Sequence, residues 1–158
     1  MEFVVSDSMD GVRIRPLQRF EDTRGWLTEL YRCDESNHQA AMCYVSSTYP
    51  GVARGPHEHT YQTDFFVFVG PGTFRVYLWD TRKESPTYLH SMRFEAGEKT
   101  PLTVLVPPRV VHAYKCISSA QGTVINLPDR LYRGFGRSED VDEIRHENVT
   151  EGSVFVLD

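Results

Sequence analysis

The sequence predicts an all-β fold, an antiparallel sandwich or barrel of the jelly-roll kind. Short runs rich in β-branched and aromatic residues recur along the chain, and Gly, Pro, Asp or Asn residues separate them. No stretch of roughly 11 or more residues shows the apolar spacing of a capped amphipathic helix. Many short strands joined by tight turns are typical of a single sandwich or barrel.

The expected strands follow one another with turn-forming residues between them. They cover residues 12–20, 26–33, 41–48, 64–69, 73–81, 88–94, 102–106, 111–117, 123–127 and 153–157. The predicted turns between these strands contain Tyr49-Pro50-Gly51, Gly70-Pro71-Gly72, Ala96-Gly97 and Pro107-Pro108. The polar segment 138–151 is expected to be a surface loop or a short helix.

The run 73–79 carries large side chains on both faces. Phe74, Val76 and Leu78 share one face, because side chains alternate along a strand. Tyr77 and Trp79 lie on the other face. This pattern predicts a strand in a sheet that is covered on both faces. Tyr77 and Trp79 are candidates for an exposed face that meets a partner subunit.

Length and charge narrow the possibilities further. The 158 residues are enough for one domain with a sizeable core, so residues 1–158 are expected to form a single domain. Acidic residues outnumber basic ones, 22 Asp+Glu against 17 Lys+Arg, which gives a net charge of −5. An acidic chain of this kind is not expected to bind nucleic acid or an anionic membrane.

The sequence shows no membrane or export signal. No apolar run approaches the ~20 residues that span a bilayer, and the first residues lack the basic start and apolar stretch of a signal peptide. Cys33, Cys43 and Cys116 form no CxxC pair, so neither a disulfide framework nor a cysteine-based zinc site is expected. A cytoplasmic location is the simplest expectation.

Three of the six histidines lie where they could act together. His57 and His59 are separated by one residue, so on a strand they project from the same face. Gln62 and Asp64 follow within a few residues, and His112 comes after the Pro107-Pro108 turn. The order Gly51, His57-Glu58-His59, Asp64, Gly70 and then Pro107 to His112 resembles the two cupin signatures. In a cupin jelly roll both signatures lie at the mouth of the barrel.

The histidines leave a metal-binding alternative open. Three imidazoles with a carboxylate or amide, here His57, His59 and His112 with Asp64 or Gln62, suit divalent Fe, Mn, Ni or Zn. A metal-binding cupin is therefore one alternative. The main interpretation below requires neither a metal nor another cofactor.

Longer motifs make the resemblance more specific. The sequence resembles the dTDP-4-dehydrorhamnose 3,5-epimerases, sugar-nucleotide enzymes built on a cupin jelly roll, from about Arg15 to Asn148. The resemblance rests on Asp22-Thr23-Arg24-Gly25-Trp26-Leu27-Thr28-Glu29, on Arg54-Gly55-Pro56-His57, on Gly72 to Thr87 with its Asp80-Thr81-Arg82-Lys83-Glu84-Ser85-Pro86-Thr87, and on Val106 to His112.

The resemblance implies roles for individual residues. Arg24 and Glu29 would hold a nucleotide diphosphate, Arg54 would bind the substrate, and His57 would be the general base. His112 would contact the sugar or the phosphate region, and Gln62 is a further candidate for substrate binding. The implied partners are a small nucleotide sugar, a dTDP-4-keto-6-deoxyhexose, and a second copy of the chain in a homodimer that exchanges N-terminal strands.

Physical chemistry agrees with these roles. A neutral imidazole is a base suited to removing a proton next to a keto group near pH 7. The planar fork of arginine binds two phosphate oxygens at once, and Arg24, Arg54 and Arg82 could each supply one. Asp80 is expected to organise a turn.

The sequence departs from the family pattern at three places. Asp64 stands about where the family has a lysine, and His59 stands where it has a glutamine. At the position where the family has a tyrosine that acts as the general acid, this sequence has Thr123-Val124-Ile125. The acid is therefore expected to be missing, and only alkyl groups are expected on the side of the substrate opposite the base. The nearest hydroxyl candidates are Tyr114 and Tyr132.

These departures leave two further functions open. The related sugar-nucleotide 3,4-ketoisomerases carry an RGxHxH motif similar to residues 54–59, in which His57 and His59 would both move protons. A protein that binds the sugar nucleotide without catalysis is the other alternative.

Overall fold

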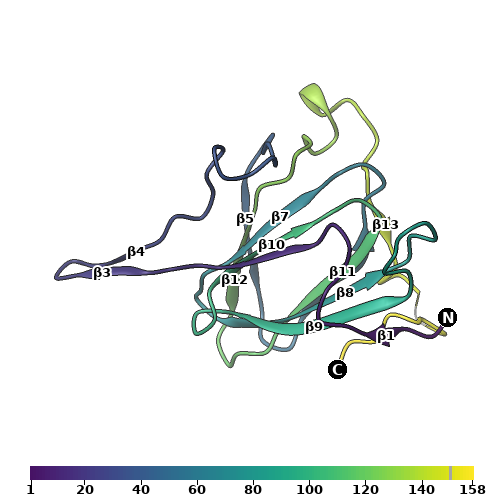
Figure 1. Ribbon diagram of the computed structural model, residues 1–158, viewed down its shortest axis with the longest axis horizontal. Helices are drawn as coiled ribbons and strands as arrows, with labels where there is room; N and C mark the ends of the chain where they lie inside the picture. Colours follow the sequence, from purple (N-terminus) through teal and green to yellow (C-terminus); the bar gives the residue numbers. More distant parts are fainter. Residues whose placement is uncertain (150) are drawn as a thin grey trace.

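The structure is a computed structural model that describes residues 1–149 and 151–158. Its strands form two main sheets and a small hairpin (Figure 1). The six-stranded sheet has the order β1 (Val4–Val5), β9 (His90–Gly97), β8 (Thr73–Asp80), β11 (Val110–Cys116), β6 (Ala53–Glu58) and β13 (Ile144–Arg145). The five-stranded sheet has the order β2 (Arg13–Pro16), β10 (Leu102–Val106), β7 (Asp64–Phe68), β12 (Gly122–Asn126) and β5 (Tyr44–Thr48). β1 and β9 are parallel, and the other pairs are antiparallel.

The core lies between the two main sheets, where one face of each strand is apolar. Phe74, Val76 and Leu78 of β8 are buried there, as the alternation along that strand predicted. They pack with inward side chains of the other sheet, among them Phe68 and Val104. The all-β sandwich expected from the sequence is therefore confirmed.

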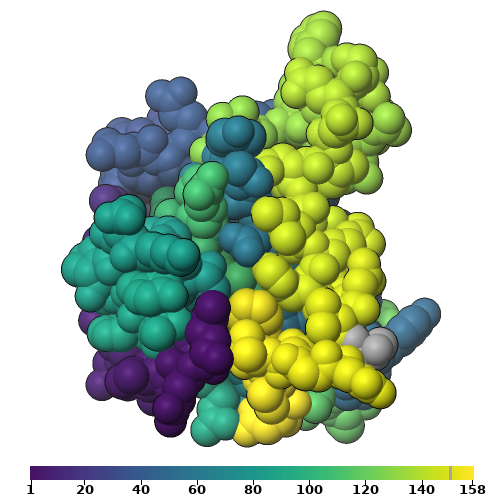
Figure 2. Space-filling view, turned by 90° about the vertical axis from the view of Figure 1, so that its right-hand side faces the viewer, coloured from purple at the N-terminus to yellow at the C-terminus, as the bar shows by residue number. Residues whose placement is uncertain are grey.

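Tyr77 and Trp79 are buried, so the expectation that they form an exposed face was wrong. They are 3% and 5% exposed, stack with ring centroids 5.9 Å apart, and pack beneath Phe155 and Leu157 from the end of the chain. Figure 2 shows the C-terminal segment running across this side of the molecule beside the N-terminal residues. The chain itself supplies the second layer on this face.

A hairpin of β3 (Phe20–Asp22) and β4 (Gly25–Leu27) projects away from the two sheets (Figure 1). Its large apolar side chains are exposed: Phe20 by 52%, Trp26 by 50% and Leu27 by 62%. Arg19 lies over the Trp26 ring at 4.3 Å from its centroid. Such an arm leaves unpartnered apolar surface well outside the body of the sandwich.

Most predicted strands are present with shifted ends. Residues 102–106 form β10 as predicted, whereas the runs 12–20 and 26–33 contain only the short strands β2 and β4 with the first residue of β3. Residues 153–157 form no strand, so the prediction of a strand there was wrong. The sequence analysis missed β1, β6 and β13. β6 was missed because Arg54-Gly55-Pro56 has the composition of a turn.

The segment after β12 is irregular. It contains one 3-10 turn, η1 (Phe135–Arg137), and then the two-residue strand β13. The loop expected over 138–151 is thus interrupted by β13, which pairs with β6, while residue 150 lies outside the described residues. Within 1–149 and 151–158 no helix is long and apolar enough to cross a membrane.

Asp80 organises the turn after β8, as expected. Its side chain is fully buried, and its carboxylate accepts hydrogen bonds from Arg82 Nε at 2.8 Å, Ser85 Oγ at 2.6 Å and Thr87 Oγ1 at 2.6 Å. Burial opposes ionisation, but the hydrogen bonds from Arg82, Ser85 and Thr87 outweigh it and lower the pKa of Asp80 to about 2. Arg82 is therefore committed to this turn.

Replacing Asp80 should destabilise the fold. Asp80→Ala leaves the partly buried Arg82 and two hydroxyls without their acceptor, so we expect the free energy of unfolding to fall by about 2–4 kcal/mol. Urea unfolding measures the change, and Glu84→Ala, at an exposed position of the same turn, is the control with an expected change within about 0.5 kcal/mol. Because the folded-state pKa is depressed, the contribution is present above the ordinary carboxyl value of 3.8 and is lost as pH falls toward 2. Equal stability of Asp80→Ala and wild type at pH 7 would contradict this role.

Candidate functional site

Strands β6 and β11 bring His57 and His112 together. The two residues are register partners across the sheet, and their ring centroids lie 4.5 Å apart at an interplanar angle of 82°. Gly55 makes this approach possible: it has φ +83°, and a Cβ there would overlap the carbonyl oxygen of His112. The sequence-predicted pairing of the two cupin signatures is present in the structure.

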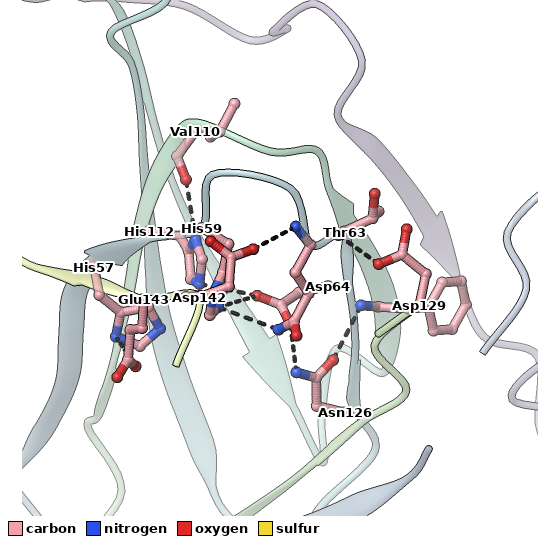
Figure 3. Close-up of polar contacts among 12 residues, drawn as sticks. His57, His59, Thr63, Asp64, Val110, His112, Asn126, Asp129, Asp142 and Glu143 are labelled. Carbon is pink, nitrogen blue, oxygen red and sulfur yellow. Dashed lines mark hydrogen bonds and ion pairs between the residues drawn. The ribbon is translucent and has the colours of Figure 1, made fainter. Parts of the chain in front are cut away.

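His59 and Asp64 complete a cluster with His112 (Figure 3). Asp64 Oδ2 lies 3.1 Å from His59 Nε2 and 3.3 Å from His112 Nε2. One nitrogen from each of His57, His59 and His112 lies within 4.8 Å of the others. Asp64 begins β7 and His59 follows β6, so both sheets contribute to the cluster.

The carboxylate of Asp64 is almost wholly removed from water, with 1% of the residue exposed. Gln62 Nε2 donates to its Oδ1 at 2.9 Å, and Asn126 Nδ2 donates to the same oxygen at 2.7 Å. Burial raises the pKa of Asp64, but the hydrogen bonds and charges of His112 and His59 outweigh it and hold the pKa well below its usual range. The group is therefore a carboxylate with its two oxygens assigned to different partners.

Backbone carbonyl groups fix the orientation of two imidazoles. His112 Nδ1 is 3.0 Å from the carbonyl oxygen of Val110, and His59 Nδ1 hydrogen-bonds to the carbonyl oxygen of Asp142. A carbonyl only accepts, so each Nδ1 carries a hydrogen and each Nε2 faces Asp64. Burial lowers the pKa of His59, but Asp64 and Asp142 outweigh it and raise the pKa to about 9.

Asp142 anchors the segment that carries these contacts. Its carboxylate accepts backbone N–H groups of Thr60 at 2.8 Å, Tyr61 at 2.9 Å and Gln62 at 3.0 Å. The residues after β12 are thereby tied to the turn that leads from His59 to Asp64. This contact joins two segments about 80 residues apart in the chain.

His57 has a different environment. Its Nδ1 lies 3.7 Å from Glu143 Oε1, and among the described residues no hydrogen bond reaches its ring. Burial, assisted by the neighbouring His112 and His59, lowers the pKa of His57 to about 2. The imidazole is therefore neutral and has a ring nitrogen available to a ligand.

A cavity of about 1470 Å³ opens beside this cluster. Phe66 and Tyr114 contribute to its wall, together with His57, His59 and most of the segment 128–147. Arginines of this wall that form no ion pair with a described carboxylate are Arg54, Arg130, Arg133 and Arg137. Arg54 donates to Thr48 Oγ1 at 3.0 Å and to the carbonyl of Ser47 at 2.9 Å, which fixes its position. The cavity thus combines an imidazole with cationic groups.

Four tyrosines line the cavity, namely Tyr44, Tyr61, Tyr114 and Tyr132. The Tyr44 hydroxyl accepts a hydrogen bond from Asn126 Nδ2 at 3.0 Å, and burial raises its pKa to about 12. The Tyr114 hydroxyl pairs with Ser46 Oγ at 3.3 Å, and burial raises its pKa as well. Tyr132 is 51% exposed on the outer part of the wall.

Val124 and Ile125 do not form a wall of this cavity, so the expectation of an alkyl face opposite the base was wrong. Val124 belongs to the core between the sheets, and Ile125 packs with Phe65 and Val67 on the outer face of the same five-stranded sheet. The next inward residue, Asn126, reaches the site instead, because it stands at the end of β12 next to Asp64.

The structure places Arg24 and Glu29 away from this cavity within one chain. Arg24 lies at the tip of the projecting hairpin, where its side chain is 88% exposed and pairs with Asp22. Glu29 pairs with Arg32 at 3.2 Å on the exposed segment after the hairpin. The other candidates, His57, His59, Gln62, Arg54, Tyr114 and Tyr132, all contribute to its wall, and His112 and Asp64 lie directly behind it.

Sequence reasoning missed Tyr44, Asn126, Asp142 and Glu143. For Tyr44 and Asn126 a signal was available, since each shares the inward face of its strand with a residue of the core or the cavity wall. Asp142 and Glu143 gave no such signal, because they stand in an acidic irregular segment where many carboxylates look alike.

Two facing antiparallel sheets with a histidine-lined polar end are the architecture of a cupin-type jelly roll. A sequence profile described as dTDP-4-dehydrorhamnose 3,5-epimerase matches residues 6–136. The chain is 36% identical over 137 residues to a probable low-salt glycan biosynthesis epimerase, Agl13, of Haloferax volcanii, covering 85% of each chain. It is 34% identical over 126 residues to the spore coat polysaccharide biosynthesis protein SpsL of Bacillus subtilis, covering 78% of this chain and 82% of the relative.

Solved structures agree on the fold. The dTDP-6-deoxy-D-glucose-3,5-epimerase RmlC of Legionella pneumophila, crystallised with dTDP-4-keto-L-rhamnose, matches with a TM-score of 0.75 at 17% identity, covering 89% of this chain and 75% of that one. At this identity the likeness shows a shared fold, the cupin jelly roll. The chain belongs to the dTDP-4-dehydrorhamnose 3,5-epimerase family, a family of sugar-nucleotide epimerases.

Proposed function

We propose that this protein catalyses epimerisation of a nucleotide-linked 4-keto-6-deoxyhexose, with His57 as the general base. The observation that carries the proposal is the position of His57: its imidazole lies in the cavity wall, and no hydrogen bond from a described residue reaches its ring. Such a base can remove the proton from a carbon next to the keto group. Glu143, whose Oε1 lies 3.7 Å from His57 Nδ1, then stabilises the imidazolium that forms.

The arginines of the cavity support an anionic substrate. Arg54, Arg130, Arg133 and Arg137 lie in the same wall as His57 and have no carboxylate partner among the described side chains. A diphosphate would satisfy them through charge-assisted, bidentate hydrogen bonds. The family's substrates are of this class, and the chemical class proposed for this chain is a thymidine diphosphate sugar.

The function is tested by incubating the protein with dTDP-4-keto-6-deoxyglucose in D₂O and following deuterium by NMR. Deuterium at C3 and C5 with inversion supports the proposed epimerase, and exchange at one of these carbons restricts the epimerase to that centre. Isomerisation of the keto group to C3 would indicate the 3,4-ketoisomerase alternative. Binding without exchange at any carbon would leave a non-catalytic binding protein and overturn the proposal.

The geometry argues against His59 as a second proton carrier, which the ketoisomerase alternative needs. His59 Nδ1 is held by the carbonyl of Asp142, and its Nε2 faces Asp64. A histidine engaged at both nitrogens cannot present one to a substrate without losing a buried contact. We therefore assign proton abstraction to His57 alone.

His57→Ala should abolish deuterium exchange while leaving the fold intact. The side chain lies in the cavity wall and is not part of the apolar core, so thermal unfolding should change little. His146→Ala removes a histidine that pairs with Glu58 outside the cluster and should retain wild-type exchange. Exchange by His57→Ala at the wild-type rate would show that another group is the base.

We assign the proton donor to Tyr44. Its hydroxyl accepts from Asn126, so its own hydrogen is free to point into the cavity, and its raised pKa keeps it protonated. Tyr44→Phe should retain binding of the substrate and reduce inversion by about 10²–10⁴-fold. Tyr114→Phe and Tyr132→Phe are the matched variants, and inversion that depends on either of them instead would reassign the donor.

We further propose a homodimer in which the projecting hairpin carries Arg24 to the cavity of a second copy. The exposed Phe20, Trp26 and Leu27 supply apolar surface for that contact. Tyr77 and Trp79 do not supply surface for this dimer, because the end of the same chain covers them.

Arg24→Ala should raise the Kd for dTDP about 10- to 100-fold, since it removes one charged phosphate contact, and leave the dimer intact. Titration calorimetry and analytical ultracentrifugation measure the two quantities. Arg93→Ala, an exposed arginine of β9, should leave the affinity unchanged. A monomer at micromolar concentration, or unchanged affinity in Arg24→Ala, would argue against this arrangement.

A further inference from the structure

The segment 130–141 is a loop whose two ends are fixed to the same turn. At its start, Thr63 N donates to Asp129 Oδ1 at 2.8 Å, and Asp129 N donates to the carbonyl of Thr63 at 3.1 Å. At its end, the carboxylate of Asp142 accepts the N–H groups of residues 60–62. A surface loop with both ends held close together can change position as one unit. The turn 60–63 therefore provides a fixed base for this loop.

Between these ends the loop is held almost entirely by itself. Its backbone hydrogen bonds, at 2.8–3.2 Å, join Gly134 to Leu131, Arg137 to Gly134, and Glu139 to Arg133. Among the described residues, the one hydrogen bond from 131–141 to the rest of the chain runs from Tyr132 N to the sulfur of Met42, a weak acceptor. The 3-10 turn η1 buries none of its residues. Because it has so few contacts with the sheets, the loop changes position at a low cost in free energy.

Large apolar side chains of the loop face water. Phe135 is 85% exposed, Tyr132 51% and Leu131 40%, and Figure 2 shows this part of the chain standing out above the rest of the molecule. All three residues also belong to the cavity wall. Moving the loop toward the cavity would remove apolar surface from water, which is favourable. The loop therefore has surface to bury on the side of the cavity.

The backbone of the loop is strained at two arginines. Arg133 and Arg137 both have a φ of 60°, in the left-handed region that is costly for a residue with a Cβ atom. Strain of this kind is typical of segments that rearrange around a ligand. A second conformation of the loop would relieve both arginines and give their side chains a new direction.

The same two arginines have no strong partner. The side chain of Arg133 has one hydrogen bond, to the carbonyl of Glu139 at 3.4 Å, and that of Arg137 has none to a described residue. Both residues line the cavity. Charge-assisted, bidentate hydrogen bonds to phosphate oxygens would be much stronger than these contacts. A ligand shifts a conformational equilibrium only if it binds one state more tightly, and a diphosphate held by both guanidinium groups meets that requirement.

We propose that residues 130–141 form a lid that closes over the cavity when a nucleoside diphosphate binds. In the closed state Arg133 and Arg137 contact the phosphates, and Phe135 covers the ligand. A closed lid keeps bulk water away from the reacting carbon of a bound sugar. The lid rests on the proposed function for the chemical class of its ligand.

Hydrogen–deuterium exchange of the full-length protein, with and without saturating dTDP, tests this closure. Backbone amides of residues 131–139 should exchange at least about 10-fold more slowly with dTDP, because closure suppresses the openings that expose them. The exposed turn at residues 98–100, between β9 and β10, should exchange at the same rate in both samples. Titration calorimetry on the same protein measures the binding of dTDP.

Phe135→Ala isolates the contribution of the lid. The ring is exposed in this structure, so the variant should unfold at the wild-type temperature without dTDP. It should raise the Kd for dTDP about 3- to 10-fold and reduce the protection of residues 131–139, because the apolar cover of the closed state is lost. Tyr49→Ala, at an aromatic residue that is 72% exposed and lies outside the cavity wall, should behave as wild type.

Several results would contradict the lid. Binding of dTDP without slower exchange in residues 131–139 would overturn the lid and leave the proposed function in place. Absence of dTDP binding to the wild-type protein would overturn both the lid and the nucleotide class proposed above. Protection that depends on protein concentration and not on dTDP would show that a second copy covers the loop. Equally slowed exchange at residues 98–100 would indicate a general stabilisation and overturn local closure.

Discussion

The negative charge of Asp64 is the constraint on which the polar end of this barrel depends. A carboxylate that is almost fully buried is tolerated only when charged or hydrogen-bonding partners surround it. Its partners come from different strands: His112 from β11, Asn126 from β12, and His59 and Gln62 from the turn between β6 and β7. Satisfying one charge therefore fixes the relative position of both sheets at this end.

The same alternation that builds the core also builds the site. On the inward face of β7, Asp64 is followed by Phe66 and Phe68, and on β11 His112 is followed by Tyr114. Each strand is apolar in the middle of the sandwich and polar where it reaches the cavity. The core therefore supports the site directly: Phe66 packs against the His112 ring with centroids 5.4 Å apart.

Local sequence pattern predicted what depends on local periodicity. The sequence correctly predicted the two faces of β8, the bounds of β10 and the meeting of the two histidine motifs. These features follow from side-chain alternation and motif spacing, which can be read within short stretches of the chain. The burial of Trp79 was not, since its cover comes from Phe155, far along the chain. β6 was not predicted for another reason: Gly55, which permits its close approach to β11, and the proline that follows it are also typical of turns.

The functional site was likewise predicted only in part, because local sequence motifs identify some of its residues and not others. Motifs identified the histidines, Asp64 and Arg54, but Asn126 lies one residue beyond the pair that the resemblance singled out. A strand's register against its neighbours decides which inward residue reaches the polar end, and that register is a property of the whole sheet.

The three histidines are not equivalent, and their backbone partners explain the difference. The carbonyls of Asp142 and Val110 hold the Nδ1–H groups of His59 and His112, so both rings are locked with Nε2 toward Asp64. No hydrogen bond from a described residue holds the His57 ring; its Nδ1 lies 3.7 Å from Glu143 Oε1, and that carboxylate also pairs with Arg145. An imidazole that must gain and lose a proton needs one nitrogen that no protein group occupies, whereas an imidazole that holds a charge in place needs both nitrogens engaged. The arrangement thus separates His57, the proposed general base, from two histidines whose rings are held toward Asp64 within the same cluster.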